Sequence, residues 1–333
     1  MDKWLQRQWS RISIWHIFLW PISLLFGLLI TIRRWCYRLR LFKATRLPVP
    51  VIVVGNLTVG GNGKTPLVIW LAQFLRTQGY TPCVISRGYG GTAIQPQSVT
   101  SATDPTLVGD EAVLLARRLR CPVWVGADRV AVARALLSAR PDCNIILSDD
   151  GLQHYRLQRD IEIAVVDGQR RFGNGLLLPA GPMREPRARL RDVDAVVIND
   201  GEALAHEYTM QLTGSDFYSL QDPTSSVQAS HFFGKKIHAV AAIGHPARFF
   251  NHLRGLGLHV VEHAFPDHYP YQPQDLHFED AEAILMTEKD AVKCTAFNIR
   301  SAWFLPVTGE LAAAFGDKIL QQLKAIENGR KTA

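Results

Sequence analysis

Residues 55–66, GNLTVGGNGKTP, lie between the apolar run 51–54 and a helical pattern, which indicates a loop that binds a nucleotide phosphate. Three glycines let the backbone turn its N–H groups toward an anion at a helix N-terminus. Lys64 can then reach the β- and γ-phosphates and Thr65 can bind Mg²⁺, although Thr58 stands where the usual G-x-x-x-x-G-K-[ST] pattern has glycine. The alternative is a glycine-rich turn with an incidental lysine. The residues predicted to bind the nucleotide are Thr58, Val59, Gly60, Gly61, Asn62, Gly63, Lys64 and Thr65.

Asp149 and Asp150 follow the apolar run 145–147 and indicate a metal site. Ligands of open α/β sheets bind at the carboxyl ends of the strands, and a phosphate loop needs a carboxylate there to hold Mg²⁺. A solvated Asp-Asp-Gly turn is the alternative for these two residues alone. Together with the phosphate loop, they predict a magnesium site formed by Thr65, Asp149 and Asp150.

Residues suited to proton transfer lie elsewhere in the chain. Asp110 stands at the start of a predicted helix, where a helix cap is the alternative to a functional role. Asp267 and His268 lie in a loop rich in proline and aromatic residues, where a histidine can orient a base or bind a substrate. His259 and His263 stand nearby but lack further ligands at the usual spacing, so we do not expect a zinc site.

Arginines crowd the Gly/Pro-rich segment 170–192, which includes Arg171 and Arg184. Planar guanidinium groups on a constrained loop suit the recognition of a phosphate or sugar phosphate. The segment SRGYGG adds Arg87 and Tyr89 directly after another predicted strand. A solvated basic face is the alternative to our interpretation that these side chains bind the substrate.

The elements that must position these side chains alternate between short apolar strands and helices. Strands buried on both faces between helices predict an α/β fold with a mostly parallel sheet. A polar stretch, with a hairpin expected near 213–216, then separates this core from a smaller second α/β lobe. The expected divisions are residues 1–46 for an N-terminal membrane anchor and basic flank, 47–200 for the phosphate-loop core, 201–235 for a connecting segment and 236–333 for the second lobe.

The composition fits a chain with a large core and an anionic partner. The 333 residues are 47% hydrophobic, and the formal net charge of +7 suggests a nucleic acid, a membrane surface or a phosphorylated substrate. The five cysteines are scattered and form no C-x-x-C pair, which argues against a disulfide framework and favours a reducing compartment.

Residues 12–32 form an uncharged apolar stretch long enough to cross a bilayer, and tryptophans lie in and around it. More basic residues follow this stretch than precede it, since only Lys3, Arg7 and Arg11 come before, and this asymmetry places the bulk of the chain in the cytoplasm. The alternatives are a buried core helix or a helix that lies in the membrane interface, given Pro21 and the serines.

In chain order, the motifs GNLTVGGNGKTP, SRGYGG, VGDEAVLLA, DDGLQH, LLPAGPMREP, FPDHYPY and TEKDAVK resemble those of the tetraacyldisaccharide 4'-kinases, the lipid A 4'-kinase family. The resemblance implies a P-loop NTPase-type fold and an enzyme of the bacterial inner membrane, with its catalytic part on the cytoplasmic side. It implies transfer of phosphate from ATP, with Mg²⁺, to the 4'-hydroxyl of a tetraacylated glucosamine disaccharide 1-phosphate. The implied partners are this anionic glycolipid and membrane lipids, with no nucleic acid.

The resemblance also implies roles for individual residues. The loop matches the family's ATP loop, threonine included, and the two consecutive aspartates match its metal carboxylates. Asp110 matches the aspartate proposed as the base, and His268 the histidine that pairs with it, with Asp267 adjacent. His154 in DDGLQH and Arg184 in PMREP are further motif members. The catalytic set is therefore expected to be Asp110, His268, Asp267 and Lys64, and the substrate-binding set Arg87, Tyr89, His154, Arg171 and Arg184.

A nucleotide switch or partition-type ATPase tethered to a membrane is the rival hypothesis. The segment TEKD, residues 287–290, faintly resembles a guanine-reading element, but its spacing does not fit N-K-x-D. Such a switch would hydrolyse nucleotide without a lipid acceptor, and this difference separates the two hypotheses experimentally.

Overall fold

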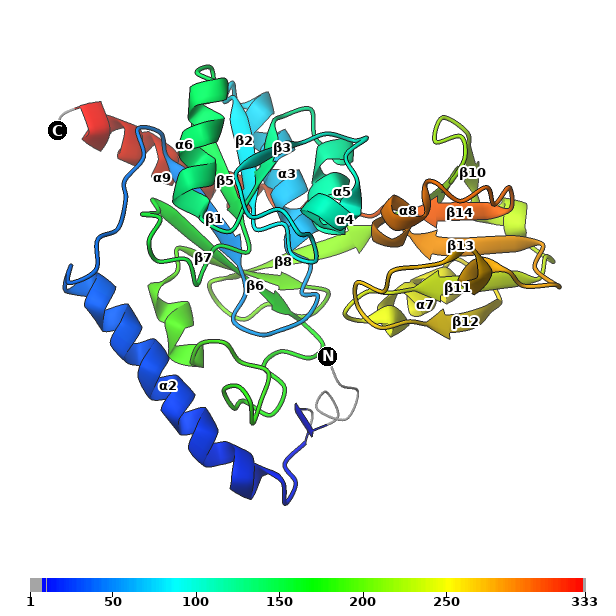
Figure 1. Cartoon of the computed structure of the whole chain (residues 1–333), viewed down its shortest axis with the longest axis horizontal. Coiled ribbons are helices and arrows are strands. Elements are labelled where there is room, and N and C mark those ends of the chain that lie inside the picture. Colours follow the sequence, from blue (N-terminus) through cyan, green and yellow to red (C-terminus); the bar gives the residue numbers. More distant parts are fainter. Residues whose placement is uncertain (1–7, 10, 332–333) are drawn as a thin grey trace.

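A computed structural model describes residues 8–9 and 11–331, and within them the chain folds into two α/β lobes, each built on its own sheet (Figure 1). Lys3 and Arg7, which contributed to the expected charge asymmetry, lie outside the described residues. The mostly parallel sheets and flanking helices confirm the predicted fold class. The first lobe contains the phosphate loop, and the smaller second lobe lies beside it.

In the described part of the chain, the first sheet has nine strands in the order β15-β8-β7-β6-β1-β5-β2-β4-β3. Only the two edge strands, β3 and β15, pair antiparallel with their neighbours. The strands are β1 (Val51–Gly55), β2 (Pro82–Ser86), β3 (Gln97–Val99), β4 (Val123–Val125), β5 (Ile145–Asp149), β6 (Ile161–Asp167), β7 (Ala195–Asn199), β8 (Glu207–Thr213) and β15 (Thr308–Leu311).

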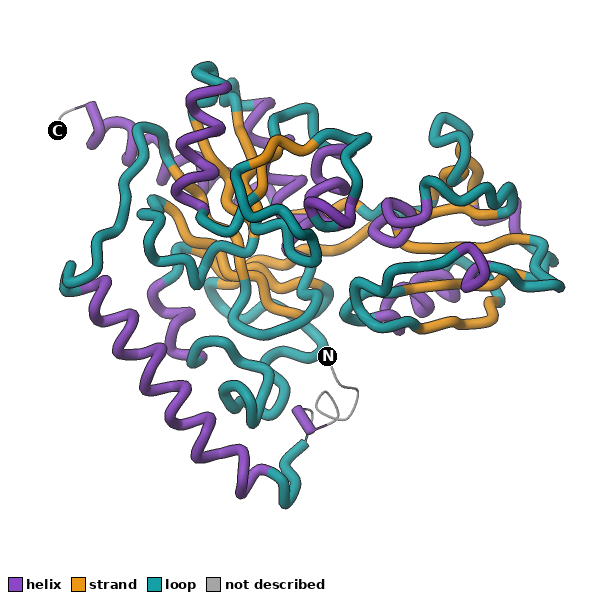
Figure 2. Tube along the Cα trace, in the orientation of Figure 1, coloured by secondary structure: helices purple, strands orange, loops and turns teal. Residues whose placement is uncertain are grey.

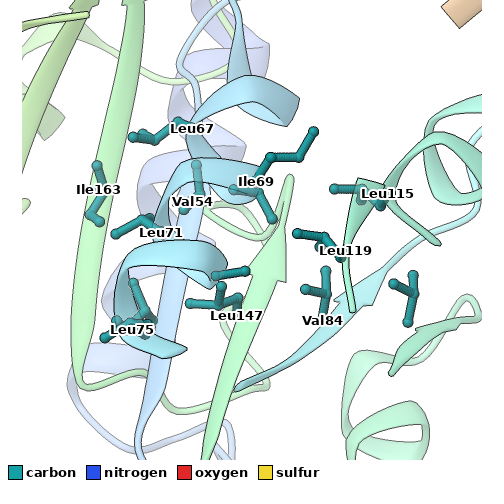
Figure 3. Close-up of a cluster of buried hydrophobic side chains, with 14 of the residues drawn as sticks. Val54, Leu67, Ile69, Leu71, Leu75, Val84, Leu115, Leu119, Leu147 and Ile163 are labelled. Carbon is teal, nitrogen blue, oxygen red and sulfur yellow. The ribbon is translucent and has the colours of Figure 1, made fainter. Parts of the chain in front are cut away.

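Helices cover both faces of this sheet. Leu67, Leu71 and Leu75 recur every four residues, so they share one face of α3 and pack on Val54 and other strand residues in the core of Figure 3. Residues of α5 and α9 join the same core, whereas α6 packs in a separate cluster with the other face. The helices are α3 (Lys64–Thr77), α4 (Pro105–Val108), α5 (Asp110–Arg118), α6 (Arg129–Ala139) and α9 (Ala313–Lys331).

The second lobe has a six-stranded sheet of described residues in the order β10-β9-β14-β13-β11-β12. The four strands from β12 to β14 in this order are parallel. The strands are β9 (Asp216–Ser219), β10 (Ser226–Gln228), β11 (Ile237–Ala241), β12 (Val260–Ala264), β13 (Ala283–Thr287) and β14 (Ala302–Leu305). The helices are α7 (Pro246–Gly255) and α8 (Glu288–Cys294), with 3₁₀ turns at Ala229–Phe232 and Pro273–Leu276.

The sheets do not follow the expected divisions at 201–235 and 236–333. β8 belongs to the first sheet, whereas β9 and β10 belong to the second, so the hairpin expected near 213–216 does not form. After β14 the chain returns to the first lobe, where β15 pairs with β8 and Phe315 of α9 is buried in the first core. The closing helix thus buries its apolar face against the larger sheet. Local sequence patterns do not indicate which of the two sheets this helix packs on.

The apolar N-terminal stretch forms α2 (His16–Arg38), which lies along one side of the first lobe (Figure 2). Within the described residues it is the one helix long and apolar enough to cross a membrane, with a mean hydropathy of 1.7, and only 11% of that window is buried. The Ser23 hydroxyl donates to the carbonyl of Leu177 at 2.8 Å, and Arg34 pairs with Asp192 at 2.6 Å. Asp192 ends a 3₁₀ turn, Arg187–Asp192, so the Gly/Pro-rich segment supports the helix.

Candidate active site

The phosphate loop connects β1 to α3, as the sequence predicts. Gly63 has a φ of 86°, and a side chain there would collide with Asn199, so glycine is required. The Asn199 side chain donates to the carbonyl of Asn62 at 3.1 Å, and the Asn62 side chain donates to the hydroxyl of Thr58 at 2.8 Å. Thr58 is therefore a buried brace within the loop, which explains a threonine where glycine is usual.

A charged cluster stands next to this loop. β1 and β5 are parallel neighbours, with Val54 opposite Asp149. The two aspartates at the carboxyl end of β5 therefore lie at the same end of the sheet as the loop that follows β1. Lys64 Nζ lies 3.6 Å from Asp150 Oδ1, and Arg184 Nη1 lies 3.2 Å from both carboxylate oxygens of Asp150. Burial would raise the pKa of Asp150, but Lys64 and Arg184 outweigh it and lower that pKa to about 2.

Asp149 has a different environment. It is 1% exposed, and its Oδ1 atom has no hydrogen-bond partner among the described residues. Burial, with the negative charge of Glu111, raises its pKa to about 7. Arg129 contacts only the main-chain carbonyl of Asp149, at 3.3 Å. A buried carboxylate oxygen without a partner is the kind of group that a bound cation satisfies.

The described residues contain no group of three His, Cys, Asp or Glu side chains that could hold a metal by themselves. Mg²⁺ commonly binds through one or two carboxylates together with substrate phosphates and water. Asp149 and Asp150, with the hydroxyl of Thr65 in the first turn of α3, fit this pattern. His263, which the sequence raised as a zinc candidate, instead faces His238 at 3.0 Å.

The proposed base and its partner come from different lobes. Asp110 begins α5 in the first lobe and is 5% exposed, and the Nδ1 atom of His268, in the loop after β12, lies 3.0 Å from both of its oxygens. Gly109 has a φ of 86°, and a side chain there would collide with the carbonyl of Tyr89. Glycine thus lets the SRGYGG loop approach the start of α5.

The pKa values of this pair shift toward the charged forms. Burial would raise the pKa of Asp110, but the hydrogen bond with His268 and the charge of Lys289 lower it. Burial would lower the pKa of His268, but the hydrogen bond with Asp110 raises it. His268 also has a φ of 61°, a strained backbone for a residue with a side chain, as occurs at functional sites.

The second lobe also touches the phosphate loop directly. Gly244 of the second lobe packs on the backbone of Gly61. A Cβ atom added at Gly244 would also lie 3.4 Å from Oδ2 of Asp267. Arg170 donates to the carbonyl of Gly61 at 3.1 Å and to Asp167 at 3.2 Å. Arg248 of α7 reaches the same buried Asp167 carboxylate at 3.0 Å. The phosphate loop and the pair formed by Asp110 and His268 therefore both lie where the two lobes meet.

The predicted substrate-binding residues are not all brought together. Arg184 lies at the carboxylates, and the exposed Tyr89 ring is 5.1 Å from the His268 ring. Arg87, which precedes Tyr89 in the SRGYGG segment, is exposed. Burial lowers the pKa of His154 to about 4. Arg171 instead pairs with Glu207 at 3.2 Å, away from the loop.

Sequence reasoning missed several residues that the structure brings to the site. The arginine that reaches the phosphate loop is Arg170, the immediate neighbour of Arg171. Arg248, Glu111 and Lys289 were not singled out either. Lys289 belongs to the TEKDAVK motif and Glu111 to VGDEAVLLA, so their motifs carried a signal, but no spacing rule indicated their roles.

The model of the tetraacyldisaccharide-1-P 4'-kinase family matches residues 15–324. The chain belongs to this family. The tetraacyldisaccharide 4'-kinase of Methylobacillus flagellatus is 52% identical over 322 residues, which cover 97% of this chain and 96% of the relative. The tetraacyldisaccharide 4'-kinase of Nitrosococcus oceani is 56% identical over 305 residues, which cover 91% of this chain and 89% of the relative.

A solved structure has the same fold. LpxK from Aquifex aeolicus in complex with ATP superposes with a TM-score of 0.76 at 29% identity, and the match covers 91% of this chain and 98% of that one. As a member of the tetraacyldisaccharide 4'-kinase family, the protein is an ATP-dependent kinase of lipid A biosynthesis that phosphorylates a glycolipid disaccharide at its 4'-position. This confirms the family and the activity that the motifs predict.

Proposed function

We propose that the γ-phosphate of ATP passes to the 4'-hydroxyl of a tetraacylated glucosamine disaccharide 1-phosphate at the junction of the two lobes. The observation that carries this proposal is the contact of Asp110 with His268. It places a carboxylate of the first lobe and an imidazole of the second beside the phosphate loop. A base at that position can act on an acceptor that lies between the lobes.

On the donor side, the chain supplies positive charge and fixed backbone groups. The N–H groups of the loop and Lys64 bind the phosphates, and the braces from Thr58 and Asn199 keep the loop in shape. Bound Mg²⁺ would neutralise charge on the phosphate oxygens, with Asp149, Asp150 and Thr65 as its protein ligands. The unpartnered Oδ1 atom of Asp149 supports this assignment.

On the acceptor side, Asp110 accepts the proton of the sugar hydroxyl. General bases must be held in orientation, and His268 does this by donating an N–H to the carboxylate. The transition state of phosphoryl transfer is loose, so the proton moves late and correct positioning matters most. Tyr89 borders this region and Arg184 lies at Asp150 on the donor side, so these two are the substrate-binding residues that the geometry favours.

We further propose that the protein sits at the inner membrane, on its cytoplasmic side, with α2 embedded along the surface. The helix of 23 residues is about 35 Å long. His16 contacts the carbonyl of Ala180 at one end, and Arg34 pairs with Asp192 near the other. A helix that spanned the bilayer would lose one set of these contacts. Its exposed apolar side suits lipid, and the substrate's acyl chains can then stay in the membrane.

The experiment is a phosphate-transfer assay with purified full-length protein, ATP, Mg²⁺ and the disaccharide monophosphate in detergent micelles. We expect labelled phosphate on the lipid. Nucleotide hydrolysis without labelled lipid would support the switch hypothesis instead. Asp110→Ala should lower turnover much more than ATP affinity, whereas the exposed Asp142→Asn serves as the matched control. Full turnover by Asp110→Ala would remove this residue from the role of base.

A further inference from the structure

Lys289, in the first turn of α8, extends from the second lobe toward the pair formed by Asp110 and His268. Its ammonium nitrogen lies 2.9 Å from Glu111 Oε1, 3.3 Å from His268 Nε2 and 3.4 Å from Asp267 Oδ1. The side chain is 14% exposed. A single positive charge therefore contacts both lobes and touches the one ring nitrogen of His268 that does not face Asp110.

The chemistry of the ammonium group restricts the histidine. An ammonium has three donors and no acceptor, so a ring nitrogen in hydrogen-bond contact with it must accept. The ring proton then resides on Nδ1, which lies 3.0 Å from both oxygens of Asp110. The opposite tautomer would aim an N–H at the ammonium and a lone pair at the carboxylate, so both contacts would be repulsive.

We propose that Lys289 is a positioning residue, which holds His268 as the neutral tautomer protonated on Nδ1 and so keeps Asp110 oriented and ionised. This inference rests on the roles proposed above for Asp110 and His268. Among the described residues, Lys289 forms no hydrogen bond with the phosphate loop or with a proposed metal ligand. It therefore acts through the histidine. Its contact with Glu111 fixes the ammonium in place when the lobes are together.

The surrounding charges show why such a residue is needed. His268 faces Asp110 from α5, Asp267 from its own loop and the ring of Tyr89, while Glu111 of α5 contacts Lys289. The two carboxylates that face it favour a doubly protonated imidazolium, and the pKa of His268 is raised although burial lowers it. Lys289 is the cation that opposes this protonation. Its removal should therefore raise the pKa of His268 further, and the pKa of Asp110 with it.

The test is a titration of full-length protein in detergent micelles, with ¹⁵N-labelled histidine, in which the His268 signals are assigned by their loss in His268→Gln. At a pH above the raised pKa of His268 we expect the Nδ1–H tautomer in the unmodified protein. In Lys289→Met the pKa of His268 should rise by about one unit, as expected when a nearby charge is removed. The exposed Lys324→Met is the matched control and should leave the His268 signals unchanged.

Kinetics give the second readout. We expect Lys289→Met to lower kcat by about 10- to 100-fold, within the contribution of general base catalysis, with ATP affinity nearly unchanged. The acidic limb of the kcat profile should move to higher pH, and Lys289→Arg should restore part of the activity. If the methionine variant is unstable, Lys289→Gln removes the charge and gives the pKa and kcat readouts, while its amide N–H can still donate to Nε2 of His268.

Two outcomes would overturn the inference. One is an unchanged tautomer and pKa of His268 in Lys289→Met and Lys289→Gln, with only thermal stability reduced, which would make Lys289 a structural ion pair for Glu111. The other is a fall in the pKa of His268. Full activity of Asp110→Asn, with the His268 shift intact, would instead overturn the proposed base while supporting the tautomer assignment.

Discussion

The proposed phosphate-binding half of the site and the proposed base, Asp110 with His268, are built in different ways. Lys64, Asp149 and Asp150 all stand at the edge of one sheet, where the pairing of β1 with β5 fixes their separation. Asp110 and His268, in contrast, come from two lobes and meet only through tertiary packing. The first half can therefore persist when the lobes separate, whereas the second half exists only when they are together. This difference offers a structural means to couple proton transfer to lobe contact.

The largest effect is expected from damage to the phosphate-binding half. Lys64→Met removes a preorganised charge from the phosphates and should lower kcat/KM by about 10²- to 10³-fold. Transfer of phosphate to the lipid, measured at several ATP concentrations, checks this. Lys324→Met, an exposed lysine on α9, is the control. Activity near that of the unmodified protein would show that the Lys64 contact with Asp150 has no part in transfer.

A smaller effect is expected when the lobes are loosened. Arg248→Met removes the α7 contact with Asp167, although Arg170 still pairs with that carboxylate. A hydrogen bond to a charged group is worth about 1.5–3 kcal/mol, so we expect the KM for ATP to rise by about tenfold. Arg254→Met, at an exposed position on the same helix, should leave this KM unchanged. Equal KM values for both variants would mean that this contact does not join the lobes over the loop.

The smallest effect is expected away from the reacting groups. Arg118 of α5 pairs with Glu288 of α8 at 2.9 Å and so also joins the lobes. Arg118→Met should lower the melting temperature by about 2 °C, as expected for a loss near 1 kcal/mol in a chain of this size. The kcat should change by less than about threefold, since the pair touches none of the proposed catalytic residues. A much larger fall in kcat would indicate that α5 and α8 set the base geometry together.

Local pattern was enough to predict where the loop, Lys64 and the two aspartates lie relative to their strands. The loop, Lys64 and the two aspartates follow strands that are recognisable as apolar runs, and parallel pairing brings their ends together. From pattern alone, a helix cap was the alternative to a functional role for Asp110. In the structure Gly109 is the N-cap of α5 and Asp110 is the first helical residue, whose Oδ1 accepts the N–H of Glu111 at 2.8 Å and also faces His268.

Long-range packing decides what local pattern could not. Lys289 and Glu111 are 178 residues apart, and no spacing rule pairs residues at that distance. Arg170 and Arg171 are consecutive, yet the turn sends Arg170 to the phosphate loop and Arg171 to Glu207. The return of α9 to the first lobe is likewise fixed by burial of Phe315 against the larger sheet. The family resemblance supplied the pairing of Asp110 with His268, which residue patterns did not.

The central claim is that Asp110 and His268 act as one unit across the two lobes, and a double-mutant cycle on kcat tests it most directly. Asp110→Asn and His268→Gln should each lower kcat by about 10²-fold or more, with ATP affinity nearly unchanged. Residues that act as a unit are not additive, so the double variant should be no slower than the slower single variant. Effects of the two substitutions that multiply in the double variant would contradict the account.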